Sequence, residues 1–387
     1  MKLRLGTFNV WGLPRPFADD VSARTRAIAR RLPDLDLDVL LIQEAWTDEM
    51  RDSLRIAALV AGFEVALASR ESGGGLMTIS RLPILRNQFQ KFQFRGDPER
   101  FATGEFLGAK GYQTLILEGR DGPFTVINTH LHARYRRSRP KLNSAVRAAQ
   151  LLQLVGEIHD LEGTAVIGGD FNCSVDDPEY QIFKGLTGAF EVAEGRKDLS
   201  TLSRSNFYKR HRSGPDKRID YIFLRPAFGM APQLDGARLL FAEREPIRGI
   251  DRSLSDHFGI ASQIGWEVAR AGVGNAVNAS HEFEAFELAR GLLAVGREEV
   301  DRREDVHLRY AGSWIAGAVL AASLRRTPAL NRRQFLRGAA SFIAFAALAP
   351  AIGYTTLARV DSDSKRDAFD GAQQILAALE ATSQRST

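Results

Sequence analysis

The stretch Ser253-Leu254-Ser255-Asp256-His257-Phe258-Gly259-Ile260 places a carboxylate beside an imidazole, directly before an apolar run. Four signatures upstream carry acids, amides or a histidine: Thr7-Phe8-Asn9, Ile42-Gln43-Glu44, Asn128-Thr129-His130 and Gly168-Gly169-Asp170-Phe171-Asn172. Each of the four lies within or follows a run that is typical of a β-strand, over residues 3–10, 39–42, 124–128 and 165–168. We therefore expect side chains from separate strand ends to converge on one pocket.

The residue types in these signatures suit metal-assisted hydrolysis of a phosphodiester. Magnesium prefers carboxylate and amide oxygens and retains several of its waters, so a few such side chains are enough to hold it. The candidate metal ligands are Glu44, Asn9 and Asp256. The expected ion is Mg²⁺, with Mn²⁺ as the alternative, because both favour oxygen ligands.

The remaining polar residues fit the proton transfers of the same reaction. A neutral imidazole can take a proton from water when a carboxylate fixes its tautomer, so His257 is the candidate base. Asp220, in Arg218-Ile219-Asp220-Tyr221, is the carboxylate expected to orient it. His130, Asp170 and Asn172 are expected to position the phosphate and to assist the leaving oxygen.

Each of these residues taken alone has a more common structural explanation. An Asp-His pair is usually a solvated turn, and a Gly-Gly-Asp sequence is usually a turn with a positive φ. The functional interpretation depends on finding all five signatures in this order in one chain.

Taken together, the signatures resemble the endonuclease/exonuclease/phosphatase superfamily over residues 1–268. Within it they resemble the neutral sphingomyelinases, through Phe8-Asn9-Val10-Trp11-Gly12-Leu13-Pro14, Ala109-Lys110-Gly111 and Thr129-His130-Leu131-His132-Ala133. The resemblance implies an α/β fold, a four-layer sandwich of two mixed β-sheets flanked by helices. It implies Glu44 as the principal metal ligand, with His257 as the base that Asp220 orients.

The activity that this resemblance implies is that of a magnesium-dependent phosphodiesterase. We expect it to hydrolyse a sphingophospholipid to ceramide and phosphocholine. The alternatives are a nuclease of the abasic-site or deoxyribonuclease type, another phospholipid or phosphoinositide phosphoesterase, and a non-catalytic membrane scaffold. Residues 1–268 carry 37 basic and 34 acidic side chains, and this near balance argues against a nucleic-acid partner. The intact site residues argue against a scaffold.

Two basic runs flank the predicted site loops. One comprises Arg134, Arg136, Arg137, Arg139 and Lys141, and the other Lys209, Arg210, Arg212, Lys217 and Arg218. Such runs are commonly solvated surface, and the alternative is contact with phosphates at a membrane or on nucleic acid.

The composition changes after Val268. Residues 269–310 are expected to form a linker and an amphipathic helix, residues 311–360 a membrane hairpin or anchor, and residues 361–387 a polar tail with a short helical pattern. The uncharged runs 311–324 and 338–358 flank five arginines without an acid, which favours a membrane hairpin in a C-terminal helical hydrophobic region. Two Ala-rich helices packed on the catalytic domain remain the alternative.

The sequence also bears on location. A single cysteine, Cys173, fits a reducing compartment, and Met1 runs directly into the first predicted strand without a signal peptide. We therefore expect a membrane-associated protein whose catalytic domain is cytoplasmic, with a phospholipid substrate. Nothing in the sequence specifies an oligomeric state.

Overall fold

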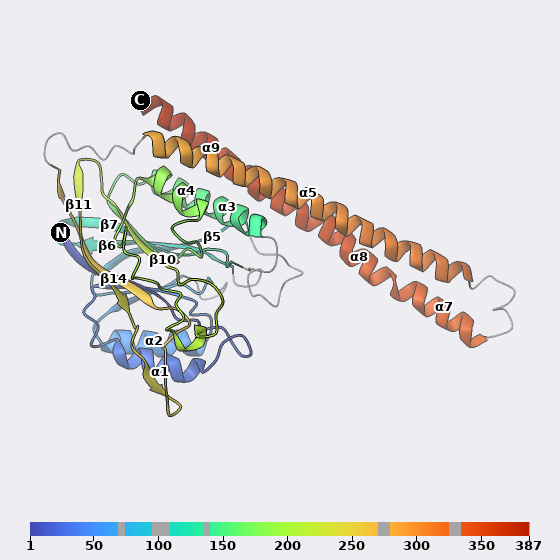
Figure 1. Ribbon diagram of the computed structural model, residues 1–387, viewed down its shortest axis with the longest axis horizontal. Coiled ribbons are helices and arrows are strands. Elements are labelled where there is room, and N and C mark those ends of the chain that lie inside the picture. Colours follow the sequence, from blue (N-terminus) through green and yellow to red (C-terminus); the bar gives the residue numbers. More distant parts are fainter. Residues whose placement is uncertain (69–73, 95–108, 135–139, 270–278, 325–333, 387) are drawn as a thin grey trace.

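Two mixed β-sheets lie face to face at the centre of the molecule (Figure 1). The computed structural model describes residues 1–68, 74–94, 109–134, 140–269, 279–324 and 334–386. The first sheet has the order β11 (Met230–Leu240), β14 (Gly259–Val268), β1 (Lys2–Asn9), β2 (Val39–Gln43), β4 (Met77–Ser80) and β3 (Glu64–Leu67). The second has the order β5 (Ile84–Lys91), β6 (Gly111–Gly119), β7 (Gly122–His130), β8 (Ala165–Asp170), β10 (Asp220–Arg225) and β9 (Phe190–Glu191).

Parallel pairing places the carboxyl ends of the site-bearing strands together. β1 pairs with β2 in parallel, and β7 pairs with β8 in parallel. β14 lies antiparallel to β1, so the residues just before β14 lie beside the end of β1. A separate two-stranded hairpin is formed by β12 (Glu245–Ile247) and β13 (Ile250–Arg252).

The central strands are apolar on both faces because helices or the other sheet cover them on each side. Along β2, Val39 and Leu41 pack between the sheets, whereas Leu40 and Ile42 pack under helices. A fully buried strand therefore reads as a continuous apolar run instead of an alternating one.

Helices cover the outer face of each sheet. α1 (Val21–Arg31) and α2 (Asp48–Val60) cover the first sheet, and α3 (Pro140–His159) and α4 (Pro178–Thr187) cover the second. In α2, Met50, Leu54 and Ala58 are buried at intervals of four residues, which puts them on one face of the helix. The predicted four-layer sandwich of two mixed sheets flanked by helices is confirmed.

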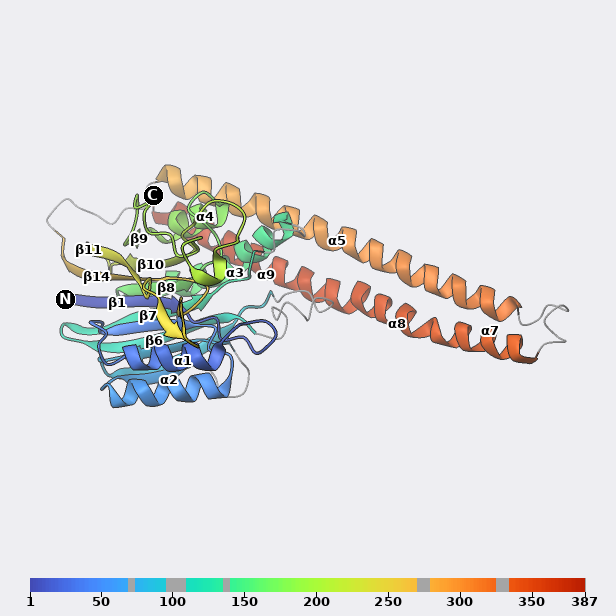
Figure 2. The same ribbon diagram turned by 60° about the horizontal axis from the view of Figure 1, so that its bottom comes forward.

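A long helical hairpin adds a further layer outside α3 and α4 (Figure 2). α5 (Ala279–Leu324) runs out along the domain, and α7 (Gln334–Ala346), α8 (Leu348–Thr356), the π-helical segment η3 (Leu357–Asp361) and α9 (Ser362–Ser386) return beside it. The sequence predicted an amphipathic helix ending near residue 310, but α5 continues through residues 311–324. No proline interrupts that part of α5, and its alanines favour helix.

Residues 362–386 also differ from the expected polar tail. They form one helix, and Phe369, Ala372 and Leu376 on α9 are buried in the core with α3 and α5. The sequence indicated only a short helical pattern because these apolar positions are spaced among many polar ones.

The far end of the hairpin projects beyond the domain in both views (Figures 1 and 2). Large apolar side chains are exposed there, including Trp314, Ile315, Leu320, Phe342 and Phe345. Within the described residues, the stretch Gly338–Arg385 contains a window apolar enough to cross a membrane, and 17% of that window is buried. Arg325, Arg326, Arg332 and Arg333, which separate the two apolar runs, lie outside the described residues.

Candidate active site

The residues predicted from the five signatures meet at one end of the sandwich. Asn9 ends β1, Glu44 follows β2, His130 ends β7, Asp170 ends β8 and Asp220 begins β10. Asp256 and His257 immediately precede β14. A cavity of about 450 Å³ is lined by six of the eight predicted site residues, namely Glu44, His130, Asp170, Asn172, Asp256 and His257.

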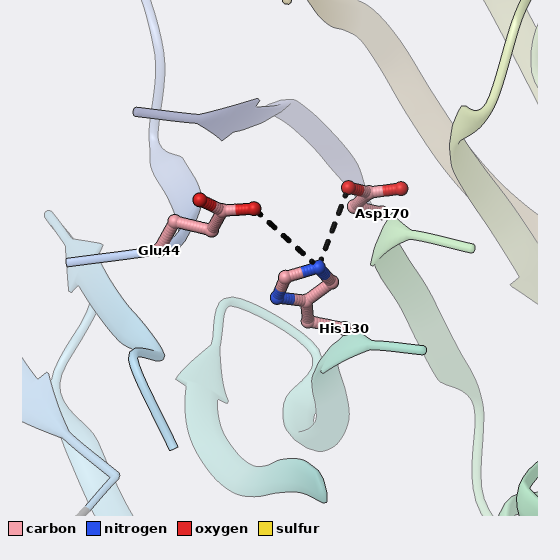
Figure 3. A group of neighbouring side chains, drawn as sticks. All are labelled: Glu44, His130 and Asp170. Atoms are coloured by element: carbon pink, nitrogen blue, oxygen red, sulfur yellow. Dashed lines mark ion pairs between the residues drawn. The ribbon is translucent and has the colours of Figure 1, made fainter. Parts of the chain in front are cut away.

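Glu44, His130 and Asp170 form the first cluster (Figure 3). His130 Nε2 lies 3.7 Å from Glu44 Oε1 and 3.5 Å from Asp170 Oδ2. Beneath them, Asn9 Nδ2 donates to Glu44 Oε1 at 3.0 Å and to Asp170 Oδ2 at 2.9 Å. The Asn9 amide thus links a carboxylate that follows a strand of the first sheet to one that ends a strand of the second.

Backbone conformation aims two of these side chains into the cavity. Glu44 has φ 61° and Asn172 has φ 52°, both in the left-handed region that costs a non-glycine residue free energy. Gly12 donates its N–H to the Glu44 carbonyl at 2.9 Å, and Asn172 donates its N–H to Asp170 Oδ1 at 2.9 Å. A Cβ at residue 12 would collide with that carbonyl, so this approach requires glycine.

Asp220 and His257 form the second cluster. His257 Nδ1 lies 3.0 Å from Asp220 Oδ2, and Asp220 is fully buried. Burial alone would lower the pKa of His257, but the Asp220, Asp256 and Asp170 carboxylates outweigh it and raise that pKa to about 10. Burial, together with the nearby Asp220, raises the pKa of Asp170 to about 7. Because Nδ1 bonds to Asp220, Nε2 is the His257 nitrogen left to exchange a proton.

Asp256, a predicted metal ligand, forms an ion pair with Lys209. Lys209 Nζ lies 2.7 Å from Asp256 Oδ2. Burial opposes ionisation of Asp256, but Lys209 and His257 hold its pKa below the ordinary value. The same carboxylate raises the pKa of Lys209. Burial raises the pKa of Glu44, and repulsion from the Asp256 carboxylate raises it further.

The first cluster fits a divalent cation. In the described part of the chain, the Oε2 atom of Glu44 is buried without a hydrogen-bond partner, which is costly for a carboxylate oxygen. One ligand atom each from Glu44, His130 and Asp170 lies within 4.8 Å of the others. The geometry therefore groups His130 and Asp170 with Glu44, whereas the amide nitrogen of Asn9 donates to these carboxylates and Asp256 pairs with a lysine.

Sequence reasoning missed two residues that the structure brings to this site. Arg24 on α1 is fully buried and donates to the carbonyls of Val10, Trp11 and Leu254, so it ties the segment after β1 to the segment before β14. Nothing in its helical context distinguishes it from exposed arginines nearby. Lys209 was counted only as part of a basic run. Arg136, Arg137 and Arg139 of the other run lie outside the described residues.

Two further signature residues support the site from below. Gln43 Nε2 donates to Asn128 Oδ1 at 2.7 Å, and Asn128 Nδ2 donates to the Ile42 carbonyl at 3.1 Å. Both side chains are fully buried, so they join the two sheets directly beneath Glu44 and His130. Their role is structural.

Known proteins share both the sequence pattern and the fold. An inositol phosphosphingolipids phospholipase C from Schizosaccharomyces pombe is 28% identical over 309 residues, which cover 68% of each chain. A putative neutral sphingomyelinase from Drosophila melanogaster is 25% identical over 276 residues, covering 68% of this chain and 61% of that protein. The match thus spans about two thirds of these relatives.

Solved structures agree at the level of the fold. The beta toxin from Staphylococcus aureus superposes with a TM-score of 0.57 at 19% identity, covering 67% of this chain and 99% of that one. A mutant of that toxin with bound magnesium ions has a TM-score of 0.51 at 18% identity, with coverage of 68% and 99%. D. rerio TDP2 complexed with a single-strand DNA product has a TM-score of 0.54 at 22% identity, also covering 68% and 99%.

The family assignment rests on the sequence itself. Residues 6–257 match the profile of the Endonuclease/Exonuclease/phosphatase family, a range that contains every predicted site residue. The chain belongs to the endonuclease/exonuclease/phosphatase family.

Proposed function

We propose that the chain is a divalent-metal-dependent phosphodiesterase that cleaves a sphingophospholipid, as sphingomyelinases do. The observation that carries this proposal is the placement of two clusters at one cavity. The Glu44 carboxylate stands beside His130 and Asp170, and His257, which pairs with Asp220, lines the same cavity. Hydrolysis of a phosphodiester requires both charge neutralisation and a positioned proton acceptor.

Different residues of the site activate the water and bind the phosphate. Asp220 holds Nδ1 of His257, so Nε2 can accept the proton of the attacking water. Lys209 and Asn172 line the same cavity and can donate to phosphate oxygens. His130 lies beside Asp170 and can assist the leaving oxygen. A divalent cation held by Glu44 would neutralise a phosphate oxygen and, by its charge, lower the pKa of His257. Magnesium is the proposed ion, with manganese as the alternative.

The substrate class comes from the relatives. The yeast and fly proteins are named for phosphosphingolipid cleavage, and each match covers 68% of this chain. We infer the corresponding reaction here, in which water attacks phosphorus and the products are ceramide and a phosphorylated headgroup. Phosphocholine is the headgroup that the sequence resemblance implies. A nuclease uses the same constellation, but the similarity to TDP2 extends to the fold alone.

The projecting end of the hairpin supports membrane association. Residues 311–324 extend about 21 Å at 1.5 Å per residue, which is less than the roughly 30 Å hydrocarbon core. We therefore propose that the projecting end of the hairpin lies in one leaflet without crossing the bilayer, so that the catalytic domain stays on the cytoplasmic side. In Figure 2 β1 runs toward the side on which the hairpin projects, so the end of β1, where the site lies, faces that side.

A substrate panel tests the proposed function. The full chain in mixed micelles is given a ceramide phosphodiester, a phosphoinositide and single-stranded and double-stranded DNA, with Mg²⁺ and then with a chelator. We expect metal-dependent release of ceramide that exceeds any DNA cleavage. Faster cleavage of DNA, or lipid cleavage that survives chelation, would refute the proposal.

A further inference from the structure

The cavity has a cationic wall in addition to the catalytic clusters. We define this wall as Arg134, Arg212 and Lys217, all of which line the cavity. Arg134 is exposed and the other two are partly exposed, whereas Asp170 and His257 are buried. The cationic wall therefore lies toward the mouth, where the part of a substrate beyond its phosphate would sit.

The wall is built on a fixed scaffold. Lys217 forms an isolated β-bridge with Leu202, and its Nζ lies 3.3 Å from Ser174 Oγ. Ser174 and Arg134 share the carboxylate of Asp177, with Arg134 bound at 2.8 and 2.6 Å. Asp177 does not itself line the cavity. Asp177 thus orders Arg134 directly and Lys217 through Ser174.

Arg212 is placed by a different element. Its backbone N–H donates to the Lys209 carbonyl at 2.8 Å, directly after the 3₁₀-helix η2 (Phe207–Lys209). Asn206 caps η2 and donates to the Ser255 carbonyl at 2.9 Å, beside Asp256. The segment that carries Arg212 is therefore bound to the segment that carries Asp256 and His257.

One aromatic face of the cavity, that of Trp11, is poorly suited to a quaternary ammonium. Trp11 and Trp46 are the aromatic side chains among the described lining residues. The Arg24 guanidinium already lies 4.8 Å from the Trp11 ring centroid, and Lys209 Nζ lies 5.9 Å from it. Choline is recognised through aromatic faces, and two protein cations at this ring would repel it. Among the described lining residues, the acidic ones are Glu44 and Asp170 of the first cluster and Asp256, which pairs with Lys209.

We propose that the cationic wall is a headgroup subsite that favours a headgroup bearing its own anionic group over choline. This inference rests on the proposed function and refines it, because the scissile phosphodiester stays at the catalytic clusters. A carboxylate or phosphate on the headgroup would form charge-assisted hydrogen bonds with Arg212 and Lys217. A choline headgroup remains a substrate, but it meets like charge at the mouth of the cavity.

Three matched ceramide phosphodiesters test this preference. Their headgroup alcohols are 3-hydroxypropionate, 3,3-dimethylbutanol and choline, which have similar size and carry negative, neutral and positive charge. The full chain is assayed with Mg²⁺ in uncharged detergent micelles at a fixed substrate fraction, so that surface charge is constant. We expect kcat/KM to fall in the order negative, neutral, positive, with a spread of about tenfold or more that narrows at high salt.

Variants separate the subsite from general electrostatics. Lys217→Met and Arg212→Met should each reduce the ratio of kcat/KM for the negative over the neutral headgroup by roughly two- to threefold. Arg210→Met removes the same charge from an exposed residue outside the lining and should leave the ratio unchanged. A choline preference in the wild type, or an unchanged ratio in both wall variants, overturns the proposal. Cleavage of none of the three lipids by a chain that cleaves DNA would instead refute the proposed function.

Discussion

Glu44 illustrates how a single residue can be both strained and functional. Its left-handed backbone and its buried, unpartnered Oε2 both cost free energy, and Gly12 and Asn9 hold it in this state. A bound cation would relieve the unpaired charge. Glu44 is thus preorganised for a ligand that the described residues do not supply.

The division of labour between the two clusters predicts two distinct kinetic defects. Glu44→Gln should raise the Mg²⁺ concentration for half-maximal activity, because it removes a charged ligand. Asp220→Asn should lower kcat at saturating Mg²⁺ by about two to four orders of magnitude, because His257 loses its orienting carboxylate. Metal titrations of kcat distinguish the two, with Glu49→Gln on the exposed face of α2 as the control. Identical titrations for the first two variants would contradict the assignment.

Arg24 offers a stability prediction at the same scale. Arg24→Met leaves the carbonyls of Val10, Trp11 and Leu254 buried without their donor. We expect the free energy of unfolding to fall by about 2–4 kcal/mol, as for other buried groups left unpaired. Denaturant unfolding measures the loss, and Arg26→Met, which removes an exposed arginine from the same helix, should change stability little. Equal effects of the two substitutions would show that the cross-link is unimportant.

The helices and strands differ in how far the sequence predicted them. Strands such as β2 were predictable because Val39-Leu40-Leu41-Ile42 is apolar throughout, and the site residues followed because each stands at a strand end. α9 was not predictable in full, because Phe369 and its neighbours are buried by contact with α3 and α5. The ion pair of Lys209 with Asp256 was also beyond prediction, since the two residues lie 47 positions apart in the sequence.

Close packing between helices fixes the hairpin on the domain. A Cβ at Gly296 of α5 would collide with the Phe369 ring and lie 2.7 Å from the Ala145 Cβ of α3. Gly296→Leu should therefore separate α9 and α5 from α3 and expose apolar core surface. Gly291 meets no atom within 4 Å, so Gly291→Leu is the matched control.

Limited proteolysis and thermal unfolding measure this separation. We expect Gly296→Leu to lower the unfolding temperature and to make α9 sensitive to protease, whereas Gly291→Leu should preserve both properties or improve stability through helix propensity. A Gly296→Leu protein as stable and protected as the wild type would show that the hairpin does not pack as described.

At the scale of the whole molecule, one end of the hairpin packs on the catalytic domain and the other end projects beyond it. The sequence suggested a catalytic domain that ends at residue 268, but Phe286, Leu293 and Phe369 share the core of α3 and α4. Truncation after residue 268 would expose this core.

The projecting end predicts how the protein binds membranes. Serine substitutions at Ile315, Leu320, Phe342 and Phe345 should abolish flotation with lipid vesicles, because each removes roughly 1.5–3 kcal/mol of apolar insertion. Activity on a water-soluble phosphodiester should persist, since these residues are remote from the cavity. A Val60→Ser and Phe228→Ser double variant removes exposed apolar side chains elsewhere and should still float. Unchanged flotation of the fourfold variant would refute the anchor.

The central claim is that base-activated water attacks the phosphorus of a sphingophospholipid at this site. Hydrolysis in oxygen-18-labelled water with Mg²⁺, followed by mass spectrometry of both products, tests it most directly. The predicted result is one labelled oxygen in the phosphate of the released headgroup and none in ceramide, with no product from His257→Ala beyond about 1% of the wild-type rate. Label in the ceramide hydroxyl, or undiminished cleavage by His257→Ala, would contradict the mechanism.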